Sequence, residues 1–196
     1  MPDGGVVEYD HQLQPFYDDV TLGSQYEDHI RWLEARAISD DCNGGQSFCS
    51  NDGMDRLTMA GYLARIYEFF GNECPTGSTP FVDVPGGQAG ADVACIYHLG
   101  ITTGTSSTTY SPDTIVNRAQ LVTFLARLWV ALGETCPEDP TPFVDEEPAW
   151  AVDGIRCMFG LGVTEGTSAT TFSPHDDVIR LHLAAFASRF AQLAAE

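Results

Sequence analysis

The chain contains no lysine. All nine of its basic residues are arginine, while aspartate and glutamate together number 28, which gives a formal net charge of −19 over 196 residues. A surface with this excess of negative charge repels nucleic acid and anionic lipid at long range, so we expect no nucleic-acid partner. The acidic excess is typical of adaptation for solubility, and acidic loops that hold cations are the alternative.

Long apolar runs are also missing. No stretch approaches the ~20 consecutive apolar residues that a membrane-spanning helix needs, so we expect no membrane span. The sequence also shows no basic segment followed by an apolar run, so no signal peptide is visible. Hydrophobic residues nevertheless make up 43% of the chain, which is enough to build a folded core.

Signatures of catalysis and of metal binding are missing too. The five histidines lack the spacing of a Ser/His/Asp set or of a metal site, so we predict no catalytic residue, no metal and no cofactor. The acidic cluster at 175–177 lacks the alternating ligands of a calcium loop, and solvated turn residues are the favoured interpretation. These absences predict a protein that is not an enzyme.

What the sequence has instead is internal repetition. The phrase Pro-Phe-Val-Asp at 80–83 returns 62 residues later at 142–145, and a Gly/Thr/Ser run at 100–106 returns at 162–168. The same step relates three helix-like segments, which begin at Arg56, Arg118 and Arg180. A fixed period of this length predicts one small unit used three times, with functional sites between the units.

The period sets the predicted organisation of the chain. An N-terminal arm at 1–14 is followed by a divergent first unit at 15–71, a second unit at 80–133 and a third at 142–196. Short loops rich in Gly, Pro and acidic residues join the units.

Each unit is predicted to contain two helices. The first is short, at 26–37, 91–99 and 149–161 in the three units. The second begins at the repeated arginine, and its apolar residues in the second unit follow the spacing i, i+3, i+4, i+7, i+11 of one helical face. That face comprises Leu121, Phe124, Leu125, Leu128 and Leu132. Three such faces favour a three-helix centre.

The six cysteines favour disulfides over metal ligation, because no CxxC or Cys/His spacing supports zinc. Four of them obey the period and form two pairs that are each 21 residues apart, and the remaining two would close a short loop in the first unit. The predicted bonds are Cys74–Cys95, Cys136–Cys157 and Cys42–Cys49. Disulfides indicate an oxidising, extracytoplasmic location.

The ordered motifs of the second unit resemble a known family. They are Phe-Val-Asp-Val at 81–84, Gly-Ile-Thr-Thr-Gly at 100–104, Tyr-Ser-Pro at 110–112 and Asn-Arg-Ala-Gln at 117–120. The third unit adds Trp150. In this order the motifs resemble the S-layer homology (SLH) family, over nearly the whole chain from about 15 to 196.

This resemblance implies a mainly α fold, in which three SLH repeats form a pseudo-threefold prism around a central three-helix bundle. It also implies that grooves between repeats bind a bacterial secondary cell-wall polysaccharide, often pyruvylated. Such binding holds an exported protein on the cell surface without a covalent link. The alternative is a structural subunit that uses the same fold to self-assemble into an extracellular layer or filament.

The resemblance implies specific ligand-binding residues as well. The pyruvyl carboxylate would pair with an arginine fork, beside the N–H groups of a helix N-terminus. Aspartates would accept hydrogen bonds from sugar hydroxyls, tryptophan would stack on a sugar face, and glycines would allow close approach of the backbone. The predicted set is Arg118, Arg180, Arg56, Asp83, Asp145, Trp150, Gly104 and Gly166.

Alternative roles stay open for these residues. The aspartates could be helix N-caps or turn formers, Arg118 could brace an acidic loop, and Trp150 could belong to the core. A second set, Arg65, Arg127 and Arg189, is expected to bridge repeats rather than bind ligand. The Arg-Ala-Gln string survives only in the second unit and the tryptophan only in the third, so we expect the groove that draws on these two units to be the first candidate.

Overall fold

The computed structural model describes residues 17–39, 42, 45–145 and 148–193. Within these residues regular structure is helical, and the only β contacts are isolated bridges. The predicted mainly α class is confirmed. The arm predicted at 1–14 and the last residues of the third unit, 194–196, lie outside the described part. The helices are α1 (Glu27–Glu34), α2 (Arg56–Phe69), α3 (Gln88–His98), α4 (Arg118–Ala131), the 3-10 helix η1 (Ala149–Ala151), α5 (Val152–Gly160) and α6 (Arg180–Leu193).

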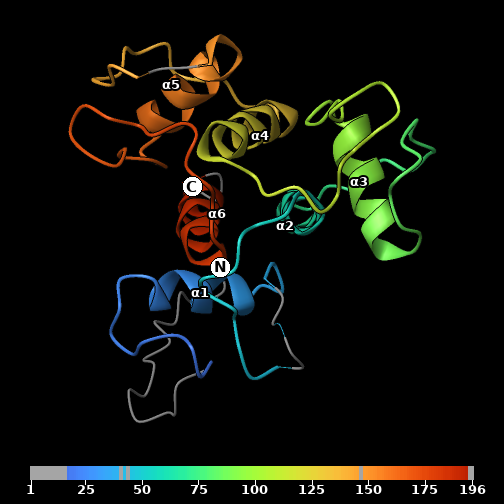
Figure 1. The fold of residues 1–196 in the computed structure, drawn as a ribbon, viewed down its shortest axis with the longest axis horizontal. Coiled ribbons are helices and arrows are strands. Elements are labelled where there is room, and N and C mark those ends of the chain that lie inside the picture. The colour runs from blue at the N-terminus through green and yellow to red at the C-terminus, as the bar shows by residue number, and fades with distance from the viewer. Residues whose placement is uncertain (1–16, 40–41, 43–44, 146–147, 194–196) are drawn as a thin grey trace, which may run out of the picture.

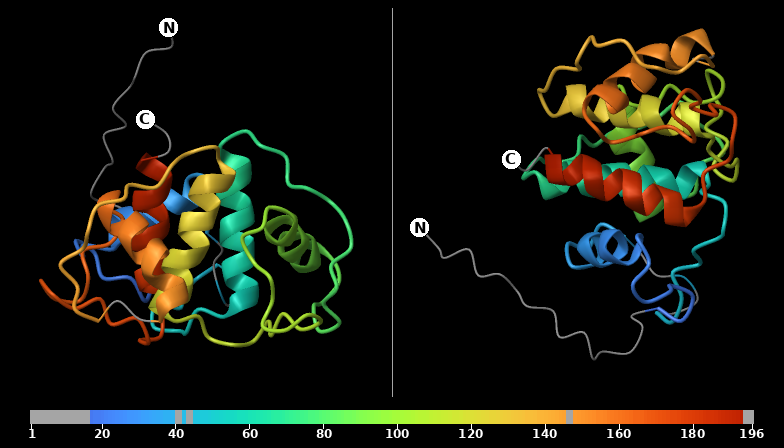
Figure 2. Two further views of the ribbon diagram at one scale, coloured as in Figure 1. Left: turned by 90° about the horizontal axis from the view of Figure 1, so that it is seen from above. Right: turned by 90° about the vertical axis from the view of Figure 1, so that its left-hand side faces the viewer.

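Three helices of 14 residues each, α2, α4 and α6, occupy the middle of the molecule (Figure 1). Seen from above, they run side by side (Figure 2, left). Each begins at one of the repeated arginines, as predicted. Most of the apolar face predicted for α4 is buried, with Leu121, Leu125 and Leu128 fully inaccessible to solvent, whereas Leu132 follows the helix and is half-buried. Burial of these faces against each other stabilises helices that are too short to persist alone.

A small ring of backbone hydrogen bonds joins the segments that lead into the three central helices. The amide of Met54 donates to Val178 O (2.7 Å), that of Val178 to Val116 O (2.9 Å), and that of Val116 to Met54 O (2.8 Å). All three side chains are fully buried and are related by the 62-residue step. The sequence analysis did not anticipate this ring, because its donors and acceptors are main-chain atoms.

Side chains then fix where two of these helices begin. Asp55 accepts a hydrogen bond from the amide of Thr58 at 2.7 Å at the start of α2. Asn117 and Gln120 form a reciprocal capping box at the start of α4. Such caps satisfy amide groups that the first helical turn leaves without a carbonyl partner.

The short helices cover the central ones in a cyclic order. α3 packs on α2, α5 on α4, and α1 on α6, so the first helix of the chain contacts the last (Figure 1). The short helices predicted at 91–99 and 149–161 agree with the structure within a few residues, while α1 ends at Glu34, earlier than expected. Gly100 and Gly162 follow α3 and α5 with φ of +73° and +72°, the left-handed conformation typical of a helix C-terminus.

All three predicted disulfides are present, and no cysteine is free. Cys74–Cys95 and Cys136–Cys157 each tie the segment after a central helix to the short helix that packs on it. Their Cα atoms lie 5.1 and 4.9 Å apart, within the range that a disulfide spans. Cys42–Cys49 closes a loop before α2.

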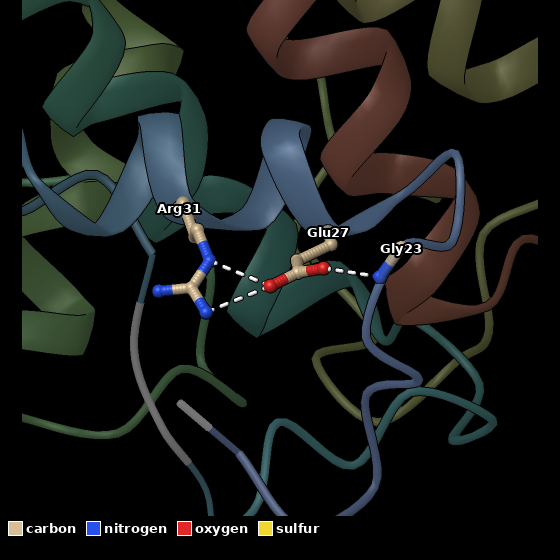
Figure 3. A network of polar contacts seen from close by, with 3 residues as sticks. All are labelled: Gly23, Glu27 and Arg31. Carbon is tan, nitrogen blue, oxygen red and sulfur yellow. Dashed lines mark hydrogen bonds and ion pairs between the residues drawn. The ribbon is translucent and has the colours of Figure 1, made fainter. Parts of the chain in front are cut away.

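The first turn of α1 is anchored by one carboxylate (Figure 3). Glu27 accepts a hydrogen bond from the amide of Gly23 at 2.6 Å and pairs with Arg31 at 2.7 Å. An acidic side chain at this end also complements the helix dipole. Together these contacts fix α1 as one wall of the cleft described below. That the elements amount to three SLH repeats arranged as a prism stays a prediction.

Candidate functional site

The three repeated arginines are buried, with side chains that are 3% to 8% exposed. Each donates from Nε to a carbonyl oxygen 2.7 to 2.8 Å away and lies over the aromatic ring of the same acceptor residue. Charge-assisted hydrogen bonding and cation–π contact therefore hold all three guanidinium groups in place. The pairs are Arg56 with Tyr110, Arg118 with Phe172, and Arg180 with Phe48.

Arg118 differs from Arg56 in one respect. Nη2 of Arg56 lies 3.5 Å from Thr102 Oγ1. Nη2 of Arg118 is buried and has no hydrogen-bond partner among the described residues. A buried cationic donor that lacks an acceptor is costly, and such groups are rare in folded proteins unless a ligand or solvent satisfies them.

Arg118 lines a cleft of about 400 Å³, bounded by α1, α6 and the loop 164–167. The cleft wall carries a second arginine, two histidines and one glutamate among the described residues. In a chain of net charge −19, the cleft thus gathers two of the nine arginines and two of the five histidines. These charged and titratable residues are Arg118, Arg189, His29, His182 and Glu165.

The helices α1 and α6 meet beside the cleft through one side-chain hydrogen bond. His29 Nδ1 lies 2.6 Å from Ser188 Oγ, across 159 residues of sequence. At the contact of α5 with α4, a Cβ added to Gly154 would lie only 3.0 Å from Thr123 Cα.

Arg118 stays charged although its surroundings lower its pKa on balance. Burial lowers its pKa, whereas the nearby carboxylates of Asp176 and Asp145 raise it. An arginine remains protonated under any condition in which a protein is folded. The site therefore presents a fixed positive charge with a free Nη2 donor, which is the arrangement that recognises a carboxylate or another oxyanion.

The helix N-terminus beside Arg118 is not available to an anion, which corrects one expectation. The amides of Arg118 and Ala119 donate to Asp176 O and Pro174 O at 2.9 Å, and that of Gln120 donates to Asn117 Oδ1 at 3.0 Å. Main-chain carbonyls and a cap thus use the donors that an anion would need. The predicted cooperation between Arg118 and these amides is wrong.

The predicted aspartates act as clamps on internal turns. Asp83 accepts hydrogen bonds from the amides of Tyr110 and Ser111, and Asp145 from those of Phe172 and Ser173, all at 2.8 Å. Both serines have positive φ, near +60°, a conformation that costs energy for a residue with a side chain. The structure thus supports the turn-forming interpretation, and recognition of sugar hydroxyls by these carboxylates stays a prediction.

Hydrogen bonding also holds these carboxylates ionised. For Asp83 the amide of Tyr110 is the main cause of a lowered pKa. For Asp145 burial acts in the opposite direction, but the amides of Phe172 and Ser173 lower the pKa on balance.

The sequence analysis missed a third clamp. Asp19 accepts hydrogen bonds from the amides of Phe48 at 2.7 Å and Ser50 at 2.6 Å. Burial raises its pKa, but these two bonds outweigh that effect and lower the pKa to about 2. Tyr17-Asp18-Asp19 stands where the other units have Phe-Val-Asp, so the position could have been found by allowing tyrosine in the motif.

The predicted glycines are required by packing. At Gly104 (φ +79°) an added Cβ would lie 2.4 Å from the ring of Phe81, and at Gly166 (φ +81°) 2.5 Å from the ring of Phe143. Packing against the ring of Phe81 thus explains the glycine at 104, and close approach of a ligand there stays a prediction. Gly166 also lines the cleft beside Arg118.

Trp150 lies in η1 and is 54% exposed, so its interpretation as a core residue is wrong. It is not among the residues that line the cleft with Arg118. A stacking role for Trp150 on a sugar face stays a prediction.

For two arginines of the second set, the hydrogen bonds run within a unit, and bridging of repeats by this set stays a prediction. Arg65 Nε donates to Ile38 O at 2.7 Å, and Arg127 Nη1 donates to Ile101 O at 2.9 Å. Both bonds join residues of the same predicted unit. Arg189 lines the cleft with Arg118.

The described residues were searched for membrane-spanning helices and for metal-binding groups. In that part of the chain no helix has the length and apolar character to cross a membrane. Across the same residues His, Cys, Asp and Glu nowhere gather in the threes that could hold a metal ion, and the acidic cluster at 175–177 forms no such group.

Comparison with known proteins gives one family and two relatives. Residues 80–122 match the sequence model of the S-layer homology domain. The chain is 32% identical over 119 residues to a protein named "Endoglucanase" from Bacillus sp. (strain KSM-635), a match that covers 60% of this chain and 12% of that protein. It is also 32% identical over 116 residues to a protein named "Cell surface protein" from Thermoanaerobacter kivui, covering 57% of this chain and 15% of that protein.

The chain thus corresponds to about an eighth of the length of these relatives. The family match falls on the second predicted unit, which carries the Asn-Arg-Ala-Gln string and therefore Arg118. The comparisons accordingly identify an S-layer homology match in the segment that supplies the central arginine of the cleft.

Proposed function

We propose that this chain is a cell-surface anchor that binds an anionic cell-wall polysaccharide in the cleft between α1 and α6. One observation carries the proposal: Nη2 of Arg118 is buried, charged and without an acceptor among the described residues, at the wall of a cleft that also holds Arg189. A carboxylate on a sugar, such as a pyruvyl ketal, would supply the missing acceptor. The protein would then function outside the cytoplasm, in agreement with its three disulfides.

The family match and the printed name of one relative support the same proposal. The S-layer homology match covers Arg118, and one relative is named a cell surface protein. We further propose that 15–71, 80–133 and 142–196 are three SLH repeats around a central bundle. The ring of hydrogen bonds among Met54, Val116 and Val178 supports that arrangement, because it relates the three units in the same way.

The structure favours a groove that differs from the one expected at first. The cleft is lined by Arg118 of the proposed second unit, by the loop 164–167 and α6 of the third, and by α1 of the first. All three units would therefore contribute to one site. Residues in which the first unit differs from the others would then form part of the binding surface, since Tyr26 and His29 of that unit line the cleft.

Co-sedimentation with purified bacterial cell-wall sacculi tests the proposal. The wild-type chain should be retained by sacculi that bear pyruvylated polysaccharide and lost when that polysaccharide is removed. Arg118→Lys should weaken retention by about 10- to 100-fold, because lysine keeps the charge but cannot present the guanidinium fork.

Arg56→Lys is the matched control. Arg56 makes the same Nε bond and ring contact as Arg118, at the same distances of 2.8 and 4.6 Å, but does not line this cleft. Equal loss of retention in both variants would indicate a general loss of stability and contradict the assignment of the cleft. No retention of the wild type, together with ordered self-assembly seen by electron microscopy, would replace the anchor by the structural subunit.

A further inference from the structure

Two histidines line the cleft, one from each of the two helices that form it. His29 of α1 makes the 2.6 Å hydrogen bond to Ser188 of α6. The ring of His182 in α6 lies 6.2 Å from the ring of Tyr26, which directly precedes α1. The sequence analysis assigned no role to either histidine.

Protonation of His29 changes the donors on the cleft wall. His29 Nδ1 and Ser188 Oγ share a hydrogen bond of 2.6 Å, in which either atom can be the donor according to the tautomer of the ring. The neutral ring has one N–H donor and the protonated ring has two. Protonation of His29 would therefore add a second N–H donor and a positive charge to the cleft wall.

The charged neighbours of these histidines come from every element around the cleft. Arg189 of α6 disfavours protonation of His29, whereas Asp28 of α1 favours it. Arg118 of α4 disfavours protonation of His182. Glu165 in the loop 164–167 is the one acidic side chain among the described residues lining the cleft, and it partly offsets the arginines.

Burial has the largest effect on both histidines. It lowers the pKa of His29 and of His182 below the usual value of 6.5, and the nearby arginines lower them further. Without a ligand, both rings are therefore neutral at pH 7. An anion bound beside them would counter the repulsion by the arginines and raise both pKa values.

We propose that His29 and His182 are ligand-binding residues of this cleft, and that their protonation tightens its hold on a carboxylate-bearing sugar as the pH falls. The inference rests on the proposed function, because it assumes that the ligand of the cleft is anionic. Its physical basis is the position of both rings on the cleft wall with Arg118 and Arg189.

The direction follows from proton linkage. If the bound anion raises the pKa of a histidine, the complex takes up protons that the free protein lacks, so affinity increases as the pH decreases. A rise of one unit in one histidine pKa corresponds to about a tenfold gain in affinity between the two pH limits. A sugar carboxylate stays ionised down to about pH 5, so the ligand itself does not titrate in this window.

Isothermal titration with a hexoside that carries a pyruvyl ketal, at pH 8 and pH 5 and constant ionic strength, tests the proposal. Affinity should be at least about threefold higher at pH 5 than at pH 8 for the wild-type chain, because the full tenfold gain per pKa unit appears only below both pKa values. In the double variant His29→Gln, His182→Gln the pH ratio should fall to about twofold or less. His98→Gln, at the end of α3 and outside the cleft, should keep the wild-type ratio.

NMR titration of the histidine ring protons gives a second readout that does not require variants. Saturation with the same hexoside should raise the pKa of His29 and His182, and the ring-proton chemical shifts of His98 at a fixed pH serve as the control. The neutral hexoside without the ketal should shift none of them.

The outcomes separate the two proposals. Binding that requires Arg118 but has the same affinity at pH 5 and pH 8 would overturn the role of the histidines and leave the anchor intact. Failure of the wild type to bind the ketal hexoside or to sediment with sacculi at either pH would overturn the proposed function itself. A pH ratio that persists in the double variant would assign the effect to other groups and likewise overturn the histidine proposal.

Discussion

Arg118 Nε donates to the carbonyl oxygen of Phe172 at 2.8 Å, while its guanidinium carbon lies 4.6 Å from the centroid of the Phe172 ring. One residue thus supplies both an acceptor and an aromatic face to the same cation, 54 residues away along the chain. Since Nε is used for folding, only the outer nitrogens of the guanidinium remain for a ligand. This contact explains how one side chain can be part of the core and of a binding site.

The same relationship predicts that the repeated arginines stabilise the fold. Replacing Arg180 by methionine keeps much of the apolar stem but leaves Phe48 O without its 2.7 Å donor. We expect the free energy of unfolding to fall by about 2–4 kcal/mol. Urea denaturation followed by circular dichroism measures the loss, and Arg36→Met, on an exposed residue that follows α1, is the control. A change below that of the control would show that the buried hydrogen bond contributes little.

Two glycines separate the effects of conformation and packing. Gly104→Ala places a Cβ 2.4 Å from the Phe81 ring in addition to its positive φ, whereas at Gly100 the φ is also positive but nothing lies within 4 Å. Gly100→Ala should cost about 1–2 kcal/mol and Gly104→Ala considerably more. Thermal melting of both variants makes the comparison. If Gly104→Ala melts at the same temperature as Gly100→Ala but loses ligand binding, Gly104 would be required for close approach of a ligand and not for packing.

The aspartate clamps predict a specific loss of stability in acid. The folded pKa of Asp19, about 2, lies below its unfolded value of 3.8, and those of Asp83 and Asp145 are lowered as well. The folded state therefore binds fewer protons, so this stabilisation is complete above about pH 5 and is lost as the pH falls toward 2.

Denaturation in urea at several pH values tests the clamps. Asp19→Asn should lower stability at pH 7 and flatten the dependence between pH 5 and pH 2, because asparagine does not titrate and offers one carbonyl acceptor in place of two carboxylate oxygens. The exposed Asp113→Asn should behave like the wild type. A pH dependence that is unchanged in Asp19→Asn would contradict the assignment.

The disulfides predict a large effect of reduction. Replacing Cys136 and Cys157 by alanine opens a link between residues 21 apart and should cost about 3 kcal/mol. Removing the Cys42–Cys49 link, which spans 7 residues, should cost less, about 2 kcal/mol. Thermal melting measures both, and intact mass with and without reductant should differ by six hydrogens. Native protein with six free thiols would show that the bonds do not form.

Much of the fold could be predicted from the sequence because it depends on neighbours along the chain. The starts of α2, α4 and α6 follow from a repeated arginine and an amphipathic pattern, and the disulfide pairing follows from the period. The roles of Asp83 and Gly104 were not predictable in this way. The sequence does not distinguish a carboxylate that binds a ligand from one that accepts a hydrogen bond from an amide of its own chain. Nor does it distinguish a glycine needed for a ligand from one needed for packing against a ring.

The sequence by itself therefore determined the helical class, the repeated unit and the covalent links. The tertiary structure decided where a ligand could bind. It brings α1 against α6, so that His29 meets Ser188 across 159 residues of sequence. In the part of the chain that the structure describes, it also leaves Nη2 of Arg118 without an acceptor. The reason is physical: local patterns fix the helices, but a cleft exists only where the packing of distant helices leaves charged side chains incompletely satisfied.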